Sequence, residues 1–230
     1  MRELIVKIAI RLGIYKQLMK WDNRYQMSRQ NKAFSQYGLE TLHRAQKAAR
    51  ESGCQLFLAF GTLLGAYRDH GFIPYDCDLD TGMRAAQRNE AFLEAMRRQG
   101  FKLIRQYYVR ENGRVEEEKF DYKGVHLDVH YFYDNEKGGL SCDLCLPHEH
   151  KDWRSANQSD GFPAIVRSVP MTEFEVSEFL GIQVHTPVEV VAWLTTLYGE
   201  HFMTPDPKWT MGDHKSRSVQ APCRLYRKDF

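Results

Sequence analysis

Three aspartates alternate with other residues in the segment 72–83, at Asp76, Asp78 and Asp80. The alternation of this segment is typical of a β-strand, in which residues two positions apart lie on one face. Their carboxylates then follow one another at about 7 Å, and like charges in such a row repel unless a cation lies between them. Carboxylate oxygens, together with substrate phosphates, bind Mg²⁺ or Mn²⁺. Asp78 and Asp80 are therefore predicted metal ligands, with Asp76 as a secondary candidate.

A second polar face occurs in the segment 119–133, which also alternates and is predicted to be strand-like. His126, Asp128 and His130 share one face there, and apolar residues occupy the other. A polar strand face is usually only exposed to solvent. If this strand lies beside the first, however, Asp128 completes a three-carboxylate cluster of the kind used in two-metal phosphoryl transfer. The same three acids would then be the catalytic residues.

A glycine-containing segment, Gly61-Thr-Leu-Leu-Gly65, precedes the aspartates and is predicted to begin a short helix over 61–71. Backbone N–H groups at a helix N-terminus bind phosphate oxygens, and a threonine hydroxyl adds a further donor. Cationic side chains after this segment and in the tail are further candidates, with a surface or structural role as the alternative for each. The predicted phosphate-binding residues are Gly61, Thr62, Gly65, Arg68, His214 and Lys215.

Four potential zinc ligands lie within nine residues, at Cys142, Cys145, His148 and His150. A structural zinc site usually draws its second ligand pair from farther along the chain, so that the metal closes a loop. Four ligands in one short, partly strand-like segment are geometrically awkward. We therefore favour buried thiols and surface histidines over a structural Zn²⁺ site here.

The remaining patterns predict intermixed helices and strands, and therefore an α+β or mixed α/β fold. The apolar run 54–60 and the segment 101–111 are predicted strands, and 134–139 is a predicted hairpin turn. The segment 147–170 is polar and is predicted to be a long surface loop, and the tail from 201 to 230 is predicted to be irregular. Helices are predicted at 37–52, 85–99 and 187–199.

Composition limits the possible classes of protein. The 32 basic and 30 acidic residues give a net charge of +2, which offers no overall electrostatic case for nucleic-acid binding. The five cysteines are odd in number and irregularly spaced, which favours reduced thiols in a cytoplasmic protein. No run reaches the roughly 18 consecutive apolar residues of a membrane-spanning helix.

The N-terminal segment is predicted to be an amphipathic helix with a basic polar face. Such a helix packs on its own domain or on a second subunit, or lies at a membrane interface, here the inner face of the membrane. We divide the chain into this helix and a polar connector, 1–36, and a catalytic domain, 37–230. The apolar stripe consists of Leu4, Ile5, Ile8, Leu12, Tyr15 and Met19.

The residues FGTLLGAYRDHGFIPYDCDLDTGM at 60–83 and HLDVHYFY at 126–133 resemble the LicD family. This family includes bacterial phosphocholine transferases and fukutin-related proteins, and the resemblance spans roughly 37–215. It implies a polymerase-β-like nucleotidyltransferase core, with a small mixed sheet flanked by helices. It also implies that Asp78 and Asp80 bind metal and that Asp128 is a third ligand or a general base. Where the family often has a further acid, this chain has Cys77.

The resemblance implies transfer of a phosphorylated group from a cytidine-diphosphate donor, such as CDP-choline or CDP-ribitol, with release of CMP. The acceptor would be a hydroxyl of a cell-surface glycan or glycolipid, such as lipopolysaccharide, capsule or teichoic acid. Two alternatives stay open from the residues themselves. One is a nucleotidyltransferase that attaches a nucleoside monophosphate, and the other is a non-catalytic module that binds nucleotide or glycan.

Overall fold

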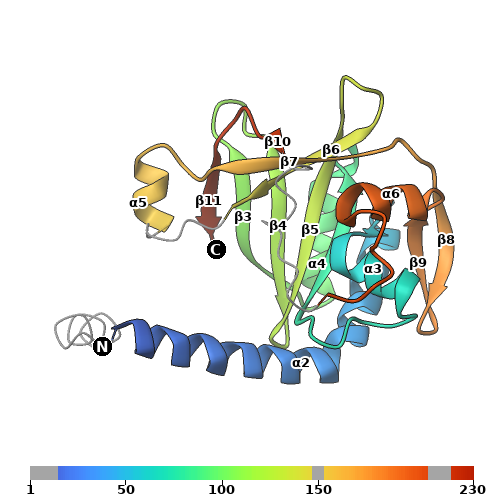
Figure 1. Ribbon diagram of the computed structural model, residues 1–230, viewed down its shortest axis with the longest axis horizontal. Coiled ribbons are helices and arrows are strands. Elements are labelled where there is room, and N and C mark those ends of the chain that lie inside the picture. Colours follow the sequence, from blue (N-terminus) through green and yellow to red (C-terminus); the bar gives the residue numbers. More distant parts are fainter. Residues whose placement is uncertain (1–14, 147–152, 207–218) are drawn as a thin grey trace.

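The computed structural model describes residues 15–146, 153–206 and 219–230, and within these it shows a mixed sheet flanked by helices (Figure 1). The observed α+β architecture confirms the predicted fold class. Eleven strands are described. They are β1 (Phe57–Leu58), β2 (Asp78–Arg84), β3 (Lys102–Val109), β4 (Val115–Tyr122), β5 (Val125–Asp134), β6 (Leu140–Cys145), β7 (Ala164–Val169), β8 (Phe174–Phe179), β9 (Ile182–Pro187), β10 (Val219–Gln220) and β11 (Leu225–Asp229).

The strand order along the main path is β10-β7-β6-β5-β2-β1-β9-β8. A side branch leads from β5 through β4 and β3 to β11. Two pairs, β2 with β5 and β1 with β9, are parallel, and the other described pairs are antiparallel. The strand β5 is the branch point, because its first part lies between β2 and β4 while its end pairs with β6.

The predicted single strand over 119–133 is wrong, because a tight turn divides it. Lys123 and Gly124 both have positive φ angles, 52° and 84°, and connect β4 to β5 as a two-residue hairpin. Such a turn needs two residues in the left-handed region, and it matches the twist of the flanking strands. The apolar positions change phase at this turn, from 120 and 122 to 125, 127 and 129, and the prediction of one continuous strand overlooked that signal.

The helix α2 (Tyr15–Glu51) is continuous, so the polar stretch 22–36 that we predicted to be a connector is helical throughout. Its C-terminal half packs on β2, β5 and α4 (Glu90–Arg98) through buried Leu42, Ala45 and Ala49. Asn89 begins α4 with a side-chain bond to the Phe92 backbone N–H, 2.9 Å long. The expected helix at 85–99 thus divides into a 3₁₀ turn, η1 (Ala85–Gln87), and α4.

Two shorter helices, α3 (Phe60–Arg68) and α6 (Val190–Tyr198), pack against each other and lie in front of the sheet in Figure 1. Trp193 of α6 is buried against Phe57 and Phe132, and its ring centroid lies 5.7 Å from that of Phe57 and 5.6 Å from that of Phe132. Aromatic contacts of this kind combine large buried area with favourable ring geometry. They fix α6 beside β1 and β5.

Several other segments differ from their predictions. Within 147–170, expected to be a loop, the described residues form α5 (Trp153–Gln158) and β7. The tail, expected to be irregular, contributes β10 and β11, and β11 pairs with β3. The hairpin of β8 and β9 was not predicted. No helix in the described ranges is both long and apolar enough to cross a membrane. Of the predicted apolar stripe, which runs from Leu4 to Met19, the part at 4–12 lies outside those ranges.

Candidate active site

The parallel pair β2 and β5 brings the predicted acids onto one face of the sheet. The two strands do lie side by side, which was the condition for Asp128 to join the other acids, and Asp80 lies directly opposite Asp128 in the register. Asp78 lies opposite His126, one step away on the same face. Leu79 and Leu127 alternate to the other face and are fully buried in the core. The apolar face therefore fixes the register that places the acids together.

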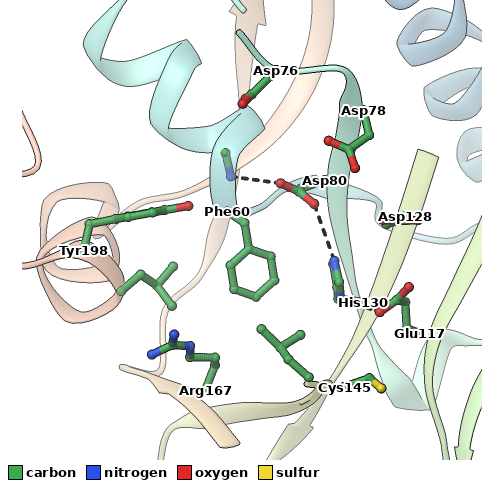
Figure 2. Close-up of a pocket in the computed structure, with 13 residues that line it drawn as sticks. Phe60, Asp76, Asp78, Asp80, Glu117, Asp128, His130, Cys145, Arg167 and Tyr198 are labelled. Atoms are coloured by element: carbon green, nitrogen blue, oxygen red, sulfur yellow. Dashed lines mark hydrogen bonds and ion pairs between the residues drawn. The ribbon is translucent and has the colours of Figure 1, made fainter. Parts of the chain in front are cut away.

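The acids line a cavity of about 310 Å³ between the sheet, α3 and α6 (Figure 2). Asp76 also lines it, although β2 begins only at Asp78, so Asp76 belongs to the preceding turn and not to the predicted strand. Cys77 is not among the lining residues. The lining consists of Phe60, Gly61, Asp76, Asp78, Asp80, Glu117, Asp128, His130, Leu144, Cys145, Arg167, Leu197 and Tyr198.

The first turn of α3 is joined directly to the acids. The Gly61 backbone N–H donates to Asp80 Oδ2 at 3.0 Å, which places a carboxylate at the positive end of the helix. Only glycine fits there without displacing its neighbours, because a Cβ at position 61 would lie 3.0 Å from Asp76 Oδ2 and 3.2 Å from Asp80 Oδ2. Gly61 therefore allows the helix to approach the carboxylates closely.

The predicted role of Thr62 is not the one that the structure shows. Its side chain is buried, and its hydroxyl oxygen accepts from the Asp80 backbone N–H at 2.8 Å. Thr62 thus ties α3 to β2 and does not line the cavity. Gly65 is also buried and outside the lining, where a Cβ would lie 2.6 Å from the Gly71 carbonyl oxygen. Its role is close packing of α3 against the following loop.

Arg68 is likewise outside the cavity lining. Its guanidinium makes two bonds to its neighbour Asp69, of 2.9 Å and 2.8 Å, and a longer one to the Phe202 carbonyl. The structure therefore gives Arg68 a structural partner at the end of α3 in place of the predicted phosphate contact. His214 and Lys215, the other predicted cationic contacts, lie outside the described residues.

Asp128 is held on one side and unpartnered on the other. Its Oδ2 lies 2.9 Å from Lys119 Nζ, across the β4–β5 pair. Its Oδ1 is buried and has no hydrogen-bond partner in the described part of the chain. Burial by itself would lower the pKa of Lys119, but Asp128 and Glu117 raise it above its ordinary value. Lys119 therefore stays charged and orients the Asp128 carboxylate.

His130 and Glu117 join the site, and the sequence analysis did not include them among the site residues. His130 Nε2 lies 3.6 Å from Asp80 Oδ1, and its Nδ1 lies 3.9 Å from Glu117 Oε2. Asp80, Asp128 and His130 each offer one ligand atom, and these three atoms lie within 4.8 Å of one another. In the sequence, only the shared strand face of Asp128 and His130 could have indicated that His130 belongs to the site. Glu117 could not be assigned without the register of β4 on β5, which places it opposite His130.

The site carries more negative charge than its cations offset. Burial, together with the charges of Asp80 and Asp128, raises the pKa of Asp78 to about 7. Burial and the charge of Asp80 raise the pKa of Asp76 to about 6. Burial also raises the pKa of Glu117, and Asp128 adds to this effect. A cation bound among these carboxyl groups would lower their pKa values again and displace their protons to water.

The predicted zinc ligands are only partly described. Cys142 is buried and Cys145 is half-buried on β6, and burial raises the pKa of the Cys145 thiol to about 12. His148 and His150 lie outside the described residues. The zinc hypothesis therefore stays a prediction that the structure does not test.

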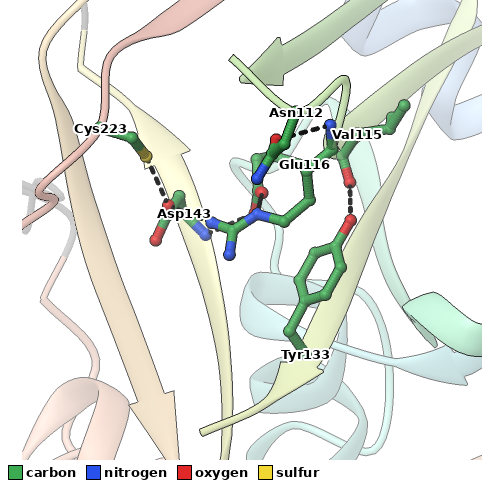
Figure 3. A network of polar contacts seen from close by, with 7 residues as sticks. Asn112, Val115, Glu116, Tyr133, Asp143 and Cys223 are labelled. Atoms are coloured by element: carbon green, nitrogen blue, oxygen red, sulfur yellow. Dashed lines mark hydrogen bonds and ion pairs between the residues drawn. The ribbon is translucent and has the colours of Figure 1, made fainter. Parts of the chain in front are cut away.

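The alternation of β4 sends Glu116 to the face opposite Glu117, where it forms a separate polar network (Figure 3). Arg114 contacts Glu116, and its Nη2 lies 2.6 Å from Asp143 Oδ2. The Cys223 thiol from the tail contacts the same Asp143 oxygen at 3.1 Å. Burial raises the pKa of Glu116 to about 7 although Arg114 lowers it. This network joins β4, β6 and the tail.

Comparison with known proteins agrees with this geometry. Residues 53–188 match the model of the LicD/FKTN/FKRP nucleotidyltransferase domain, which is more than half of the chain. The chain belongs to the LicD/FKTN/FKRP family. The match includes α3, β2, β4 and β5, and therefore the described acids of the cavity. It confirms the resemblance noted from the sequence.

Curated relatives of this LicD-family chain include the ribitol-5-phosphate transferase FKTN of Mus musculus and that of Homo sapiens. The mouse protein is 27% identical over 180 residues, covering 76% of this chain and 35% of the relative. The human protein is 26% identical over 181 residues, covering 77% of this chain and 35% of the relative. The chain thus spans about a third of the length of these relatives.

Proposed function

We propose that this protein is a phosphotransferase that moves a phosphorylated group from a CDP-activated donor to a glycan hydroxyl, releasing CMP. The observation that carries the proposal is the placement of Asp80 opposite Asp128, facing the start of α3 inside one cavity. A family core with acids in this position suits phosphoryl transfer, in which catalysis is mostly positioning and charge stabilisation. The names of the relatives support a phospho-alditol as the transferred group.

The residues present fit a divalent cation such as Mg²⁺ or Mn²⁺. Asp78, Asp80 and Asp128 supply hard oxygen donors, and the buried Oδ1 of Asp128 has no partner among the described residues. Burial first, and then the charges of Asp80 and Asp128, raise the pKa of Asp78, so its ionised form is disfavoured without added positive charge. When bound, the metal would offset charge on the donor diphosphate and acidify the acceptor hydroxyl.

The protein's own groups then act in a simple sequence. The cavity walls hold the donor with its phosphates at the acids, near the Gly61 end of α3. The acceptor oxygen attacks the distal phosphorus in line, forming the new P–O bond while the bond to CMP breaks. The hydroxyl proton leaves to water or to Asp128, whose orientation Lys119 maintains. Gly61 and Thr62 keep Asp80 in place throughout.

A donor screen tests this proposal. We expect CMP release from CDP-ribitol, CDP-glycerol or CDP-choline in the presence of Mg²⁺ or Mn²⁺ and a glycan acceptor. Asp80→Asn should lower the rate at least about 100-fold, because it removes charge at the reacting phosphates. Asp121→Asn is the matched control, since Asp121 lies on the same face of β4 as Glu117 and Lys119 but outside the cavity lining. Retained activity in Asp80→Asn would rule out the assigned role.

Labelling the two halves of the donor separates the alternatives. Transfer of the head-group phosphate with release of CMP supports the proposal. Transfer of the nucleotide half instead would establish a nucleotidyltransferase. Tight binding of donor in calorimetry, without turnover on any acceptor, would favour a non-catalytic binding module.

A further inference from the structure

Asp80, Asp128 and His130 offer a cation two carboxylate oxygens and one imidazole nitrogen. The sequence had led us to expect carboxylate ligands alone. Asp80 Oδ1 and His130 Nε2 face each other at 3.6 Å, and Asp128 completes the group of atoms within 4.8 Å. Asp78 lines the same cavity but is not part of this group. The geometry therefore separates Asp78 from the other two predicted ligands.

Each of the three residues is held from outside by a different group. Asp80 Oδ2 accepts from the Gly61 N–H, which leaves Oδ1 directed toward His130. Asp128 Oδ2 pairs with Lys119, and Oδ1 has no partner among the described residues. In metal sites the ligands are commonly oriented by such outer partners, with one atom of each left for the metal.

The histidine is held from outside by ring packing and not by a hydrogen bond. His130 is only 6% exposed, and its Nδ1 faces Glu117 Oε2 at 3.9 Å while Nε2 faces Asp80. At this distance Glu117 makes no hydrogen bond, and Nδ1 has no partner among the described residues, so the ring proton can lie on Nδ1 and leave the Nε2 lone pair for a cation. Phe60 contacts the same ring edge to face, with centroids 4.8 Å apart, and restricts its rotation. His130 Nε2 is thus presented as a donor atom.

We propose that Asp80, Asp128 and His130 form one mixed oxygen and nitrogen site that binds Mn²⁺ in preference to Mg²⁺. Mg²⁺ favours oxygen ligands and retains its waters, whereas Mn²⁺ binds carboxylate oxygens and also accepts an imidazole nitrogen beside them, so the nitrogen sets the preference between these two ions. The second observation besides the cluster itself is the buried, unpartnered Asp128 Oδ1, on a side chain 6% exposed. The inference deepens the proposed function, since it names the metal of that same site.

Electron paramagnetic resonance of Mn²⁺ added to the full chain tests the inference without donor or acceptor. We expect pulsed spectra to show coupling to one ¹⁴N nucleus, and Mg²⁺ to displace Mn²⁺ only at about 100-fold excess or more. His130→Asn should remove the nitrogen coupling and weaken Mn²⁺ binding by about 10-fold or more. His126→Asn is the matched control, because His126 lies on the same face of β5 but outside the cavity lining.

A second variant keeps the test decisive if His130→Asn folds poorly. His130→Asp replaces the nitrogen with oxygen, so it should bind Mn²⁺ without nitrogen coupling and should bind Mg²⁺ relatively better than the wild type. The inference would be overturned if the wild type shows no nitrogen coupling. It would also be overturned if His126→Asn loses the coupling and the His130 variants keep it.

The two proposals fail separately. Nitrogen-coupled Mn²⁺ binding without CMP release on any donor would leave this inference standing and would remove the proposed function. Equal CMP release with Mg²⁺ and Mn²⁺, in a protein whose bound Mn²⁺ shows no nitrogen coupling, would support the proposed function and remove this inference.

Discussion

At the residue scale, the acids of the cavity are arranged at a cost to the metal-free protein. Asp78 has a pKa of about 7, raised by burial and by Asp80 and Asp128, whereas a carboxyl of this type in an unfolded chain titrates near ~3.9. The folded protein therefore binds the extra proton more tightly than the unfolded chain does. Its contribution to stability is present below about pH 4 and is lost as the pH rises through about 7.

We therefore expect Asp78→Asn to stabilise the metal-free protein at pH 8, by about 1–3 kcal/mol, because it removes a disfavoured charge. The difference should be much smaller at pH 5, where most of the Asp78 carboxyl is protonated. Urea unfolding in the presence of a chelator at both pH values measures this. Addition of Mn²⁺ should reduce the difference at pH 8, because a cation bound in the cavity offsets the charge of Asp78. A stabilisation that does not change with pH would contradict the assignment.

The sequence predicted the carboxylates of the site well and their partners poorly. Asp78, Asp80 and Asp128 were recognisable because residue type and alternation carry that information. Glu117 and Lys119 reach the site only through the pairing of β4 with β5, and a pairing register is a tertiary property. Thr62 was assigned to phosphate because its competing partner, the backbone N–H of Asp80, is not visible in a local pattern.

At the element scale, the pairing of β1, β2 and β5 brings aromatic rings close to the backbone of β2, which the composition of these strands does not reveal. Gly82 lies on β2 between Phe57 and Phe132, and a Cβ at this position would lie 2.2 Å from the Phe57 ring and 2.9 Å from the Phe132 ring. Phe57 in turn stacks on Phe174 of β8 with centroids 4.1 Å apart. The glycine therefore lets β1, β2 and β5 share one aromatic layer.

Gly82→Ala should destabilise the protein by about 1–3 kcal/mol, because the ring of Phe57 must move in a close-packed core. The free energy of unfolding in urea measures the effect. Gly38→Ala in α2 is the control, since its Cβ would meet Phe34 only at an ordinary 3.4 Å. That variant should be neutral or stabilising by up to about 1 kcal/mol, owing to helix propensity. Equal effects of the two variants would refute the packing argument.

Element boundaries were the weaker part of the sequence-based fold. The presence and type of the helices near 37–52, 60–68 and 187–199 were correct, because apolar spacing and glycine stops mark them. The stretch 22–36 of α2 was missed because its polar residues have no apolar stripe that favours a helix over a connector, whereas the helix at Tyr15 and Met19 was predicted. The strands of the tail were missed because β11 pairs with β3, more than 100 residues away.

At the scale of the whole molecule, the network of Arg114, Glu116, Asp143 and Cys223 connects the tail to the sheet (Figure 3). Arg114 is the cation of this network, and Glu116 and Asp143 are both buried. A pair of buried carboxylates is tolerated only with a compensating charge. Beside the pairing of β10 with β7 and of β11 with β3, this polar part of the tail's attachment therefore depends on one guanidinium.

Arg114→Met should destabilise the protein by about 3–5 kcal/mol at pH 7.5, because it leaves two buried carboxylates without their cation. Adding Glu116→Gln to that variant should restore part of the loss. Arg110→Met is the control, since Arg110 is exposed and lies 3.5 Å over the Tyr226 ring, a contact worth about 1 kcal/mol or less. Thermal and urea unfolding measure all three. A loss in Arg114→Met no larger than in Arg110→Met would contradict this account.

The parallel pairing of β2 with β5 also has a consequence for folding order. Thr81 of β2 bonds to the Asp128 carbonyl across 47 positions of sequence, and the hairpin of β4 and β5 needs only a two-residue turn. Local hairpins form before distant strands pair, because closing a long loop costs more entropy. We therefore expect the β3-β4-β5 meander to form first and β2 to join it later. The metal-binding face would then arise late in folding, so the first bound Mn²⁺ would mark the arrival of β2.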